Sequence, residues 1–260
     1  MSNSSIISSI ENNLGIIMLN RPDVLNSFNK EMAMSLQKVL DAFEADDKVR
    51  CIYISGNGRA FSAGQDLEEA ISSEGPELQN IVKDHYNPII RRLRSIEKPI
   101  VCAVNGVAAG AGANIALACD IVVASKNASF IQAFSKIGLI PDSGGTYTLP
   151  RLIGIQRASA YMMTGEKIEA DTALQMGMLY KVFEEDQFEA ESKKLALKMS
   201  TMPTFGLGLT KRALNASQMN SLEQQLDLEE NLQTKAGNSH DYTEGVNAFL
   251  EKRKPEFKGK

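Results

Sequence analysis

The 260-residue sequence contains no tryptophan, two histidines and three cysteines. Cys51, Cys102 and Cys119 are an odd number of widely spaced residues, each in an apolar run, which indicates buried, inert thiols rather than a disulfide framework. Because the cysteines form no paired motif and histidine is scarce, we expect no metal site. His85 and His240 lie in no recognisable motif and are predicted to be surface or interface residues.

Basic residues do not outnumber acidic residues in this sequence. The chain has 28 basic and 32 acidic residues, a formal net charge of −4, so no global field favours nucleic acid or an anionic membrane. The first ten residues have neither the basic segment nor the apolar run of a secretory signal, and polar residues interrupt the most apolar stretch, 100–124. We therefore expect a cytoplasmic protein with neither nucleic acid nor membrane as a partner.

Short β-rich runs alternate with helical patterns through the first half of the chain. The runs cover 14–20, 50–55, 99–104 and 120–125, and apolar residues recur at helical spacing between them. This order predicts an α/β fold with a mostly parallel sheet that helices cover on both faces. The β pattern disappears after about residue 190, which suggests a core of 1–190 and a helical region of 191–260.

Glycine clusters stand at 56–67, 105–120 and 138–154, and the first two directly follow predicted strands. Ligands of open α/β sheets collect beyond the carboxyl ends of strands, where glycine-rich turns expose backbone N–H groups that can hold an oxyanion. Tight turns and close helix packing are the alternative roles for these residues. Neither GxxxxGK[ST] nor GxSxG is present, so the chemistry is expected to come from carboxylates and backbone.

Four ordered segments resemble the crotonase (enoyl-CoA hydratase/isomerase) superfamily, and the likeness extends to the C-terminus. The segments are NRPDVLNSF (20–28), GRAFSAGQDL (58–67), KPIVCAVNGVAAGAGANIALACDIVVAS (98–125) and GLIPDSGGTYTLPRLIG (138–154). The resemblance implies a spiral of strand, strand, helix turns with a helical C-terminal trimerisation region. It also implies a homotrimer or hexamer, an acyl-CoA substrate and no separate cofactor.

The same resemblance places on Gln65 and Ala111 two backbone N–H groups that polarise the thioester carbonyl. Backbone amides suit this task because they do not titrate and cannot swing away. The resemblance and the neighbouring sequence also suggest a set of substrate-binding residues: Ala63, Asp66, Leu67, Gly110, Asn114, Phe134 and Arg21.

The chain departs from the hydratases of this superfamily, which position water with two glutamates. An ungapped alignment puts Asn114 and Phe134 at those positions, so hydration is not expected, whereas Asp142 stands where hydratases usually have glycine. Its likeness to family isomerases implies that Asp142 is the catalytic acid/base. Apolar neighbours such as Phe134, Ile137 and Leu139 would raise its pKa, and the alternative is that Asp142 only caps the following helix.

The segment 128–146 is especially similar to ring 1,2-epoxyphenylacetyl-CoA isomerases of phenylacetate breakdown, which convert a ring epoxide to an oxepin and also move enoyl-CoA double bonds. The alternative is a cis-Δ3, trans-Δ2-enoyl-CoA isomerase or another crotonase of fatty-acid breakdown. Proteins of a different class, an acyl-CoA-binding scaffold or an RNA-binding member, are less favoured by the residues.

The nucleotide end of CoA is anionic and needs a local basic patch on an acidic protein. Arg21 and the terminal EKRKPEFKGK, which has five basic and two acidic residues, are the candidates. The alternative is that this terminal segment is a solvated tail.

Overall fold

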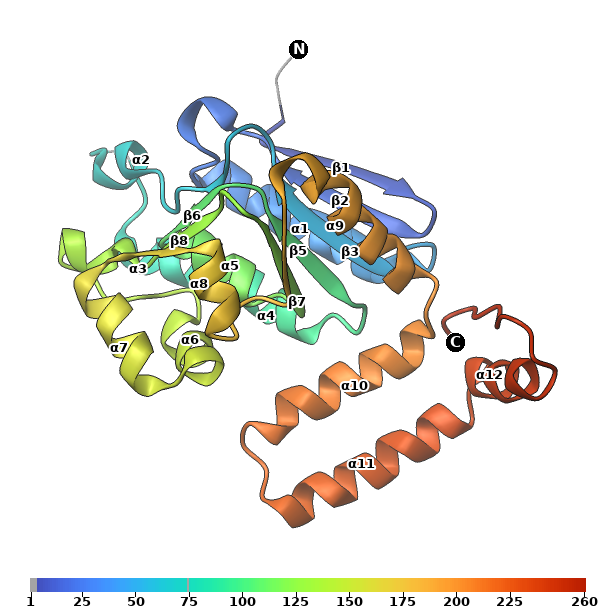
Figure 1. Cartoon of the computed structure of the whole chain (residues 1–260). Coiled ribbons are helices and arrows are strands. Elements are labelled where there is room, and N and C mark those ends of the chain that lie inside the picture. The colour runs from blue at the N-terminus through green and yellow to red at the C-terminus, as the bar shows by residue number, and fades with distance from the viewer. Residues whose placement is uncertain (1–3, 74) are drawn as a thin grey trace.

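The computed structural model describes residues 4–73 and 75–260, and the strands of this part of the chain form two sheets (Figure 1). The six-stranded sheet is parallel except for its first, antiparallel strand. Its strands are, in spatial order, β1 (Ile6–Glu11), β2 (Leu14–Leu19), β3 (Cys51–Gly56), β5 (Ile100–Val104), β7 (Ile121–Ser125) and β10 (Lys181–Phe183). The four-stranded sheet contains β4 (Ala60–Ser62), β6 (Val107–Ala109), β8 (Ser129–Ile131) and β9 (Lys167–Glu169), with an antiparallel β8–β9 pair.

Alternation along the central strands gives the larger sheet two buried faces. Ile17 of β2 and Ile52 of β3 join the core with helix α1 (Lys30–Ala45), whereas Ile16 and Tyr53 face α9 (Glu185–Ser200). Successive side chains of a strand point to opposite faces, so near-continuous apolar runs are required when helices cover both. The predicted α/β fold with a covered, mostly parallel sheet is confirmed.

Three consecutive turns of the chain repeat one pattern. A strand of the larger sheet is followed by a short strand of the smaller sheet and then by helix, as in β3–β4–α2, β5–β6–α5 and β7–β8–η3. Because β4, β6 and β8 pair in parallel, the segments that follow them gather at one edge of the smaller sheet.

The remaining helices complete the core and its C-terminal extension. They are η1 (Pro22–Val24), α2 (Leu67–Ile71), α3 (Leu78–Asn80), η2 (Ile81–Tyr86), α4 (Asn87–Ser95), α5 (Ala111–Leu117), η3 (Ala133–Ile137), α6 (Gly145–Ile153), α7 (Ile155–Thr164), α8 (Ala170–Gln175), α10 (Thr204–Ser217), α11 (Leu222–Gly237) and α12 (His240–Leu250). In Figure 1, α10 and α11 run side by side beneath the sheet, and α12 follows at the end of α11 that lies near the start of α10. No helix of the described residues is long and apolar enough to cross a bilayer.

The four predicted strands match β2, β3, β5 and β7 within a residue or two, and all three cysteines are buried as expected. The suggested division at 190/191 lies inside α9, which packs on the main sheet. The helices that extend from the core therefore begin at α10. The sequence did not point to β1, because its pattern has only one buried residue and the strand is held by pairing with β2.

Candidate active site

The loops after β4 and β6 lie against each other because these strands are parallel neighbours. Gly64 makes this approach possible, since a Cβ at that position would lie 2.8 Å from the carbonyl oxygen of Ala109 and 3.4 Å from the nitrogen of Ala111. Its φ of +92° also lies in the region that favours glycine. The structure thus brings the peptide of Gln65 beside the start of α5, where Ala111 stands.

The N–H groups of Gln65 and Ala111 both lack an acceptor within the described part of the chain. The Phe28 N–H donates to the carbonyl of Gly64 at 2.7 Å, and the Phe28 carbonyl accepts the N–H of Asp66 at 2.9 Å. These two hydrogen bonds fix the backbone on either side of Gln65 and do not use the Gln65 N–H. Ala111 is the first residue of α5, where a helical N–H has no intrahelical partner. Two adjacent free amides can therefore polarise a carbonyl oxygen.

Gly110 and Phe134 shape the surface beside these amides. Gly110 has a φ of +51° and donates its N–H to the carbonyl of Ile131 at 2.9 Å, which ties the turn before α5 to β8. The ring of the buried Phe134 would lie 3.8 Å from a Cβ at Gly110. Ile137 and Leu139, also predicted to be apolar neighbours of Asp142, are 53% and 38% exposed, so they provide less apolar shielding than expected in the single chain.

Asp142 lies half-buried in the loop before α6. Burial raises the pKa of its carboxyl, and a 2.8 Å hydrogen bond from the Ser143 hydroxyl to Oδ1 partly opposes the rise. Asp142 does not cap the next helix: α6 begins at Gly145 with Gly144 at its N-cap, and no side chain makes a cap hydrogen bond there. The helix-cap alternative is therefore wrong for this structure, and the carboxylate is free for another role.

Two buried amide side chains, those of Asn114 and Gln132, hold the Asp142 loop in place through hydrogen bonds. Asn114 donates from Nδ2 to the carbonyl oxygen of Asp142 at 2.9 Å, and Gln132 donates from Nε2 to Asn114 Oδ1 at 2.8 Å. Gly145 packs directly on Asn114, since a Cβ there would collide with its amide. The Asn114 amide is thus used within the protein. No motif pointed to Gln132, which only the pairing of β8 places here.

Tyr86 also reaches the site although the sequence analysis did not single it out. Its hydroxyl donates to Gln65 Oε1 at 2.6 Å, and burial, with the nearby Asp142 charge second, raises its pKa well above the usual value. The preceding His85 is buried, so the prediction of a surface or interface position is wrong for this residue. Burial on η2 lowers the pKa of His85.

The other predicted binding residues lie close to Gln65, either in sequence or through the Arg21–Asp66 ion pair. Arg21 forms an ion pair with Asp66 at 2.9 Å and also donates to the carbonyl of Ser27 at 2.6 Å. Ala63 donates its N–H to the carbonyl of Leu25, while Leu67 begins α2 and is 50% exposed. Arg21 is therefore a basic group beside the oxyanion loop, with its guanidinium already partly engaged.

Within one copy of the chain, the basic C-terminal tail lies away from the Gln65 loop. Arg50 donates to the carbonyl of Phe257 at 2.7 Å, and buried Asp241 accepts the N–H groups of Lys258 and Gly259, each at 2.7 Å. Arg50 directly precedes β3, so the tail lies at the amino end of the main sheet, whereas the Gln65 loop follows β4, which comes after the carboxyl end of β3. The backbone of residues 257–259 is therefore held by hydrogen bonds, whereas the basic side chains of the tail are exposed.

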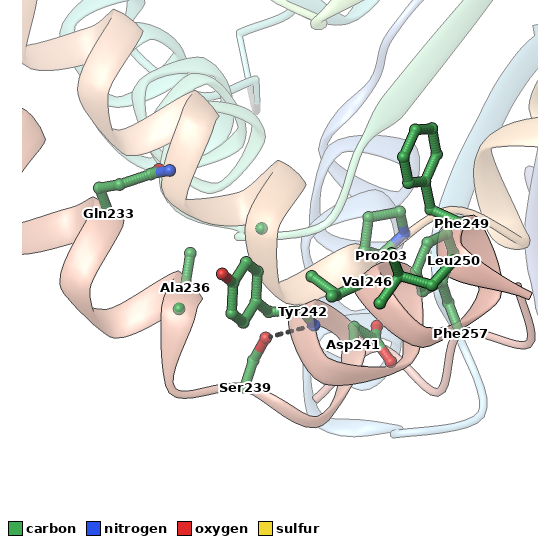
Figure 2. Close-up of a pocket in the computed structure, with 13 residues that line it drawn as sticks. Pro203, Gln233, Ala236, Ser239, Asp241, Tyr242, Val246, Phe249, Leu250 and Phe257 are labelled. Atoms are coloured by element: carbon green, nitrogen blue, oxygen red, sulfur yellow. Dashed lines mark hydrogen bonds between the residues drawn. The ribbon is translucent and has the colours of Figure 1, made fainter.

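An apolar hollow of about 420 Å³ lies among the C-terminal helices (Figure 2). Figure 2 shows Tyr242, Val246, Phe249 and Leu250 of α12 near Pro203 at the start of α10. The free amides and Asp142 are on other elements, so this hollow is separate from the candidate active site.

Comparisons with known proteins agree with this geometry. The family described as enoyl-CoA hydratase/isomerase matches residues 9–260. The chain is 48% identical to the 1,2-epoxyphenylacetyl-CoA isomerase of Escherichia coli K12 over 98% of each chain, and 37% identical to the 2,3-dehydroadipyl-CoA hydratase of the same organism over 99% of this chain and all of that one. The crystal structure of an enoyl-CoA hydratase from Bacillus anthracis superposes with a TM-score of 0.91 at 29% identity, covering 98% of this chain and 100% of that one.

The protein belongs to the enoyl-CoA hydratase/isomerase family and has the crotonase fold. These two relatives are an isomerase and a hydratase, so the choice between the two reactions depends on the residues of the site.

Proposed function

We propose that this protein is an isomerase of acyl-CoA thioesters that converts ring 1,2-epoxyphenylacetyl-CoA to its oxepin isomer. In this proposal the Gln65 and Ala111 N–H groups bind the thioester oxygen and Asp142 moves the proton. The 48% identity to an isomerase of that name supports the substrate class.

The reaction needs only one acid/base group. Cleavage of the ring C–C bond shared with the epoxide gives a seven-membered oxepin with no atom gained or lost. Asp142 then takes a proton from the carbon next to the thioester carbonyl, and the two amides stabilise the enolate oxygen. Return of the same proton to a ring carbon moves the double bond into conjugation with the thioester, so no cofactor is consumed.

The observation that carries the proposal is the pair of free amides, one of them at the start of α5, together with the half-buried carboxylate of Asp142, whose loop is held by Asn114 of the same helix. Burial raises the pKa of Asp142, which favours a group that takes up a proton and returns it. At the positions of the two hydratase glutamates this chain has Asn114, whose amide is already hydrogen-bonded, and Phe134, whose ring cannot position water. These features favour isomerisation over hydration.

The same machinery supports a second candidate, a cis-Δ3, trans-Δ2-enoyl-CoA isomerase. A 36% identical relative from Streptococcus mutans is a trans-2-decenoyl-[acyl-carrier-protein] isomerase, which likewise moves a double bond. One carboxylate could carry the proton from C2 to C4 of the acyl chain. A panel of epoxyphenylacetyl-CoA, 3-enoyl-CoA and 2-enoyl-CoA esters separates the two candidates from each other and from a hydratase.

The Asp142→Asn variant tests the catalytic assignment. Asparagine keeps the size and the acceptor for Ser143, but it cannot take the proton, so we expect kcat to fall about 100-fold or more. Binding of phenylacetyl-CoA, measured by calorimetry, should persist because the oxyanion amides are unchanged.

Glu68→Gln is the matched control, since Glu68 is an exposed carboxylate on α2 beside the oxyanion loop. It should retain wild-type kcat. Turnover by Asp142→Asn at the wild-type rate, with an unchanged circular dichroism spectrum, would refute the role of Asp142. Hydration of a 2-enoyl-CoA as the dominant activity would refute the proposed reaction.

A further inference from the structure

The helix that carries Tyr86 contains a π-helical segment, η2, between α3 and α4. A π turn admits an additional residue and changes the direction of the side chains that follow; such turns are frequent at functional sites. The buried Gln37 of α1 donates from Nε2 to the carbonyls of Asp84 and His85 at 2.8 and 3.0 Å. Gln37 thereby stabilises the wide turn that presents Tyr86.

Tyr86 is fixed on both its ring and its hydroxyl. The side chain is 1% exposed, and the ring packs edge-on to Phe28 with centroids 6.1 Å apart. Its hydroxyl bonds to Gln65 Oε1, and Gln65 Nε2 donates to the carbonyl of Asp66 at 3.2 Å. Both ends of the Gln65 amide are thus tied down.

These contacts hold the oxyanion loop from two sides. Phe28 fixes the backbone on either side of Gln65, and Tyr86 fixes the side chain of Gln65 itself. A rotation of the peptide that carries the Gln65 N–H would break the Phe28–Gly64 hydrogen bond, because the Gly64 carbonyl is part of the same peptide, and would shift the Gln65 Cα from which the side chain reaches Tyr86. A donor contributes to carbonyl polarisation only when it points at the developing oxyanion.

We propose that Tyr86 is a positioning residue that aims the Gln65 N–H at the thioester oxygen through its hydroxyl contact with the Gln65 side chain. The inference rests on the proposed function, because it assigns a role within the same oxyanion site. Tyr86 does not itself take the proton in this scheme.

Tyr86→Phe removes the hydroxyl and keeps the ring against Phe28. We expect kcat for isomerisation to fall about 10-fold while KM changes less than about twofold, since one neutral hydrogen bond is lost and the binding surface remains. The control is Tyr53→Phe, because Tyr53 is also buried but bonds to Ser192 at 3.0 Å on the face covered by α9. It should leave kcat unchanged.

A second measurement reports on the carbonyl without turnover. Phenylacetyl-CoA labelled with ¹³C at the thioester carbonyl has neither an epoxide nor a double bond to move, and its infrared C=O band shifts to lower frequency when an oxyanion hole polarises it. We expect a clear shift on the wild-type protein and on Tyr53→Phe, and a smaller shift on Tyr86→Phe.

Gln65→Met removes the acceptor instead of the donor and keeps the Gln65 N–H. It should reduce the infrared shift at least as much as Tyr86→Phe does, and the double variant should lose no more than Gln65→Met alone, because that variant already lacks the contact with the Tyr86 hydroxyl. This second variant preserves the test if Tyr86→Phe folds poorly.

A wild-type infrared shift in Tyr86→Phe, or fully additive losses in the double variant, would overturn the positioning role while leaving the proposed reaction standing. Conversely, a wild-type protein that turns over none of the isomerase substrates would refute the proposed function. The infrared comparison would still decide whether Tyr86 aims the amide.

Discussion

At the scale of single residues, the site depends on what surrounds one carboxylate. Asp142 sits in a loop whose carbonyl is held by Asn114 and whose next residue, Ser143, adopts a left-handed φ of +50°. That conformation is uncommon outside glycine and asparagine, and the Gly145 N–H closes the turn around Ser143 by donating to the Asp142 carbonyl at 2.8 Å. The folded structure therefore keeps the Asp142 carboxylate half-buried on a loop whose backbone is strained at Ser143.

Burial of the Asp142 carboxyl makes the stability of the protein depend on pH. Because burial raises the pKa of Asp142, the unfolded chain loses this proton at a lower pH than the folded protein does. Stability from this group therefore falls as pH rises from the unfolded value of 3.8 to the folded value, and the penalty is constant above it.

Asp142→Asn carries no such penalty. We expect the variant to be more stable than the wild type at pH 7, with the difference disappearing as pH falls below the unfolded pKa. Urea unfolding at several pH values measures this. A wild-type protein that is the more stable of the two at pH 7 would contradict the raised pKa.

At the scale of elements, the oxyanion site is produced by two short parallel strands. β4 and β6 have only three residues each, yet their pairing sets the loops after them side by side. Gly64 lets the loops touch, and Gly112 packs on Ser62, where a Cβ would lie 2.7 Å from the serine side chain. Small residues in this region thus serve both the site and the packing of α5.

Gly64→Ala should separate the two amides. Alanine at φ +92° is strained, and its Cβ would press on the carbonyl of Ala109, so we expect kcat/KM to fall about 100-fold, as for loss of one oxyanion donor. Gly206→Ala is the control, because Gly206 lies in α10, where an added Cβ would meet no neighbouring atom within 4 Å. It should keep wild-type kcat/KM and raise the free energy of unfolding by about 0.5–1 kcal/mol. Equal activity of the two variants would rule out this role for Gly64.

At the scale of the whole molecule, α10 to α12 extend from the core and are joined to it by buried polar contacts. Lys211 of α10 is buried and pairs with Asp120 at 2.8 Å, while Arg50 and Asp241 hold the C-terminal tail. Further out, the same helices expose Leu222 and Phe249 by 72% and 81%, and Phe249 lines the hollow of Figure 2.

Exposed apolar residues on these helices are best buried by other copies of the chain. We expect the protein to be a trimer or a hexamer in solution, as measured by light scattering with size-exclusion chromatography. A Phe249→Glu variant should dissociate, whereas Met163→Glu, an exposed apolar position on α7, should not. A wild-type monomer at micromolar concentration would refute this prediction.

The sequence by itself determined the central strands and the α/β class, and its resemblance to the crotonase superfamily pointed to Gln65, Ala111 and Asp142 as candidates. The strands are local features, because apolar runs and glycine turns follow from the residues around each position. It also identified Asn114 and Phe134 as departures from the hydratases, since a residue type can be read without a structure.

Only the tertiary structure decided which side chains act together. Tyr86 and Gln65 are 21 residues apart, and Asn114 and Asp142 are 28 apart, so no local pattern predicts their hydrogen bonds. Gln132 reaches Asn114 because β8 pairs with β6, and Tyr86 reaches Gln65 because Gln37 supports a π turn. The burial that raises the pKa of Asp142 is likewise a property of the packed chain, since desolvation depends on neighbours that the sequence order does not bring together.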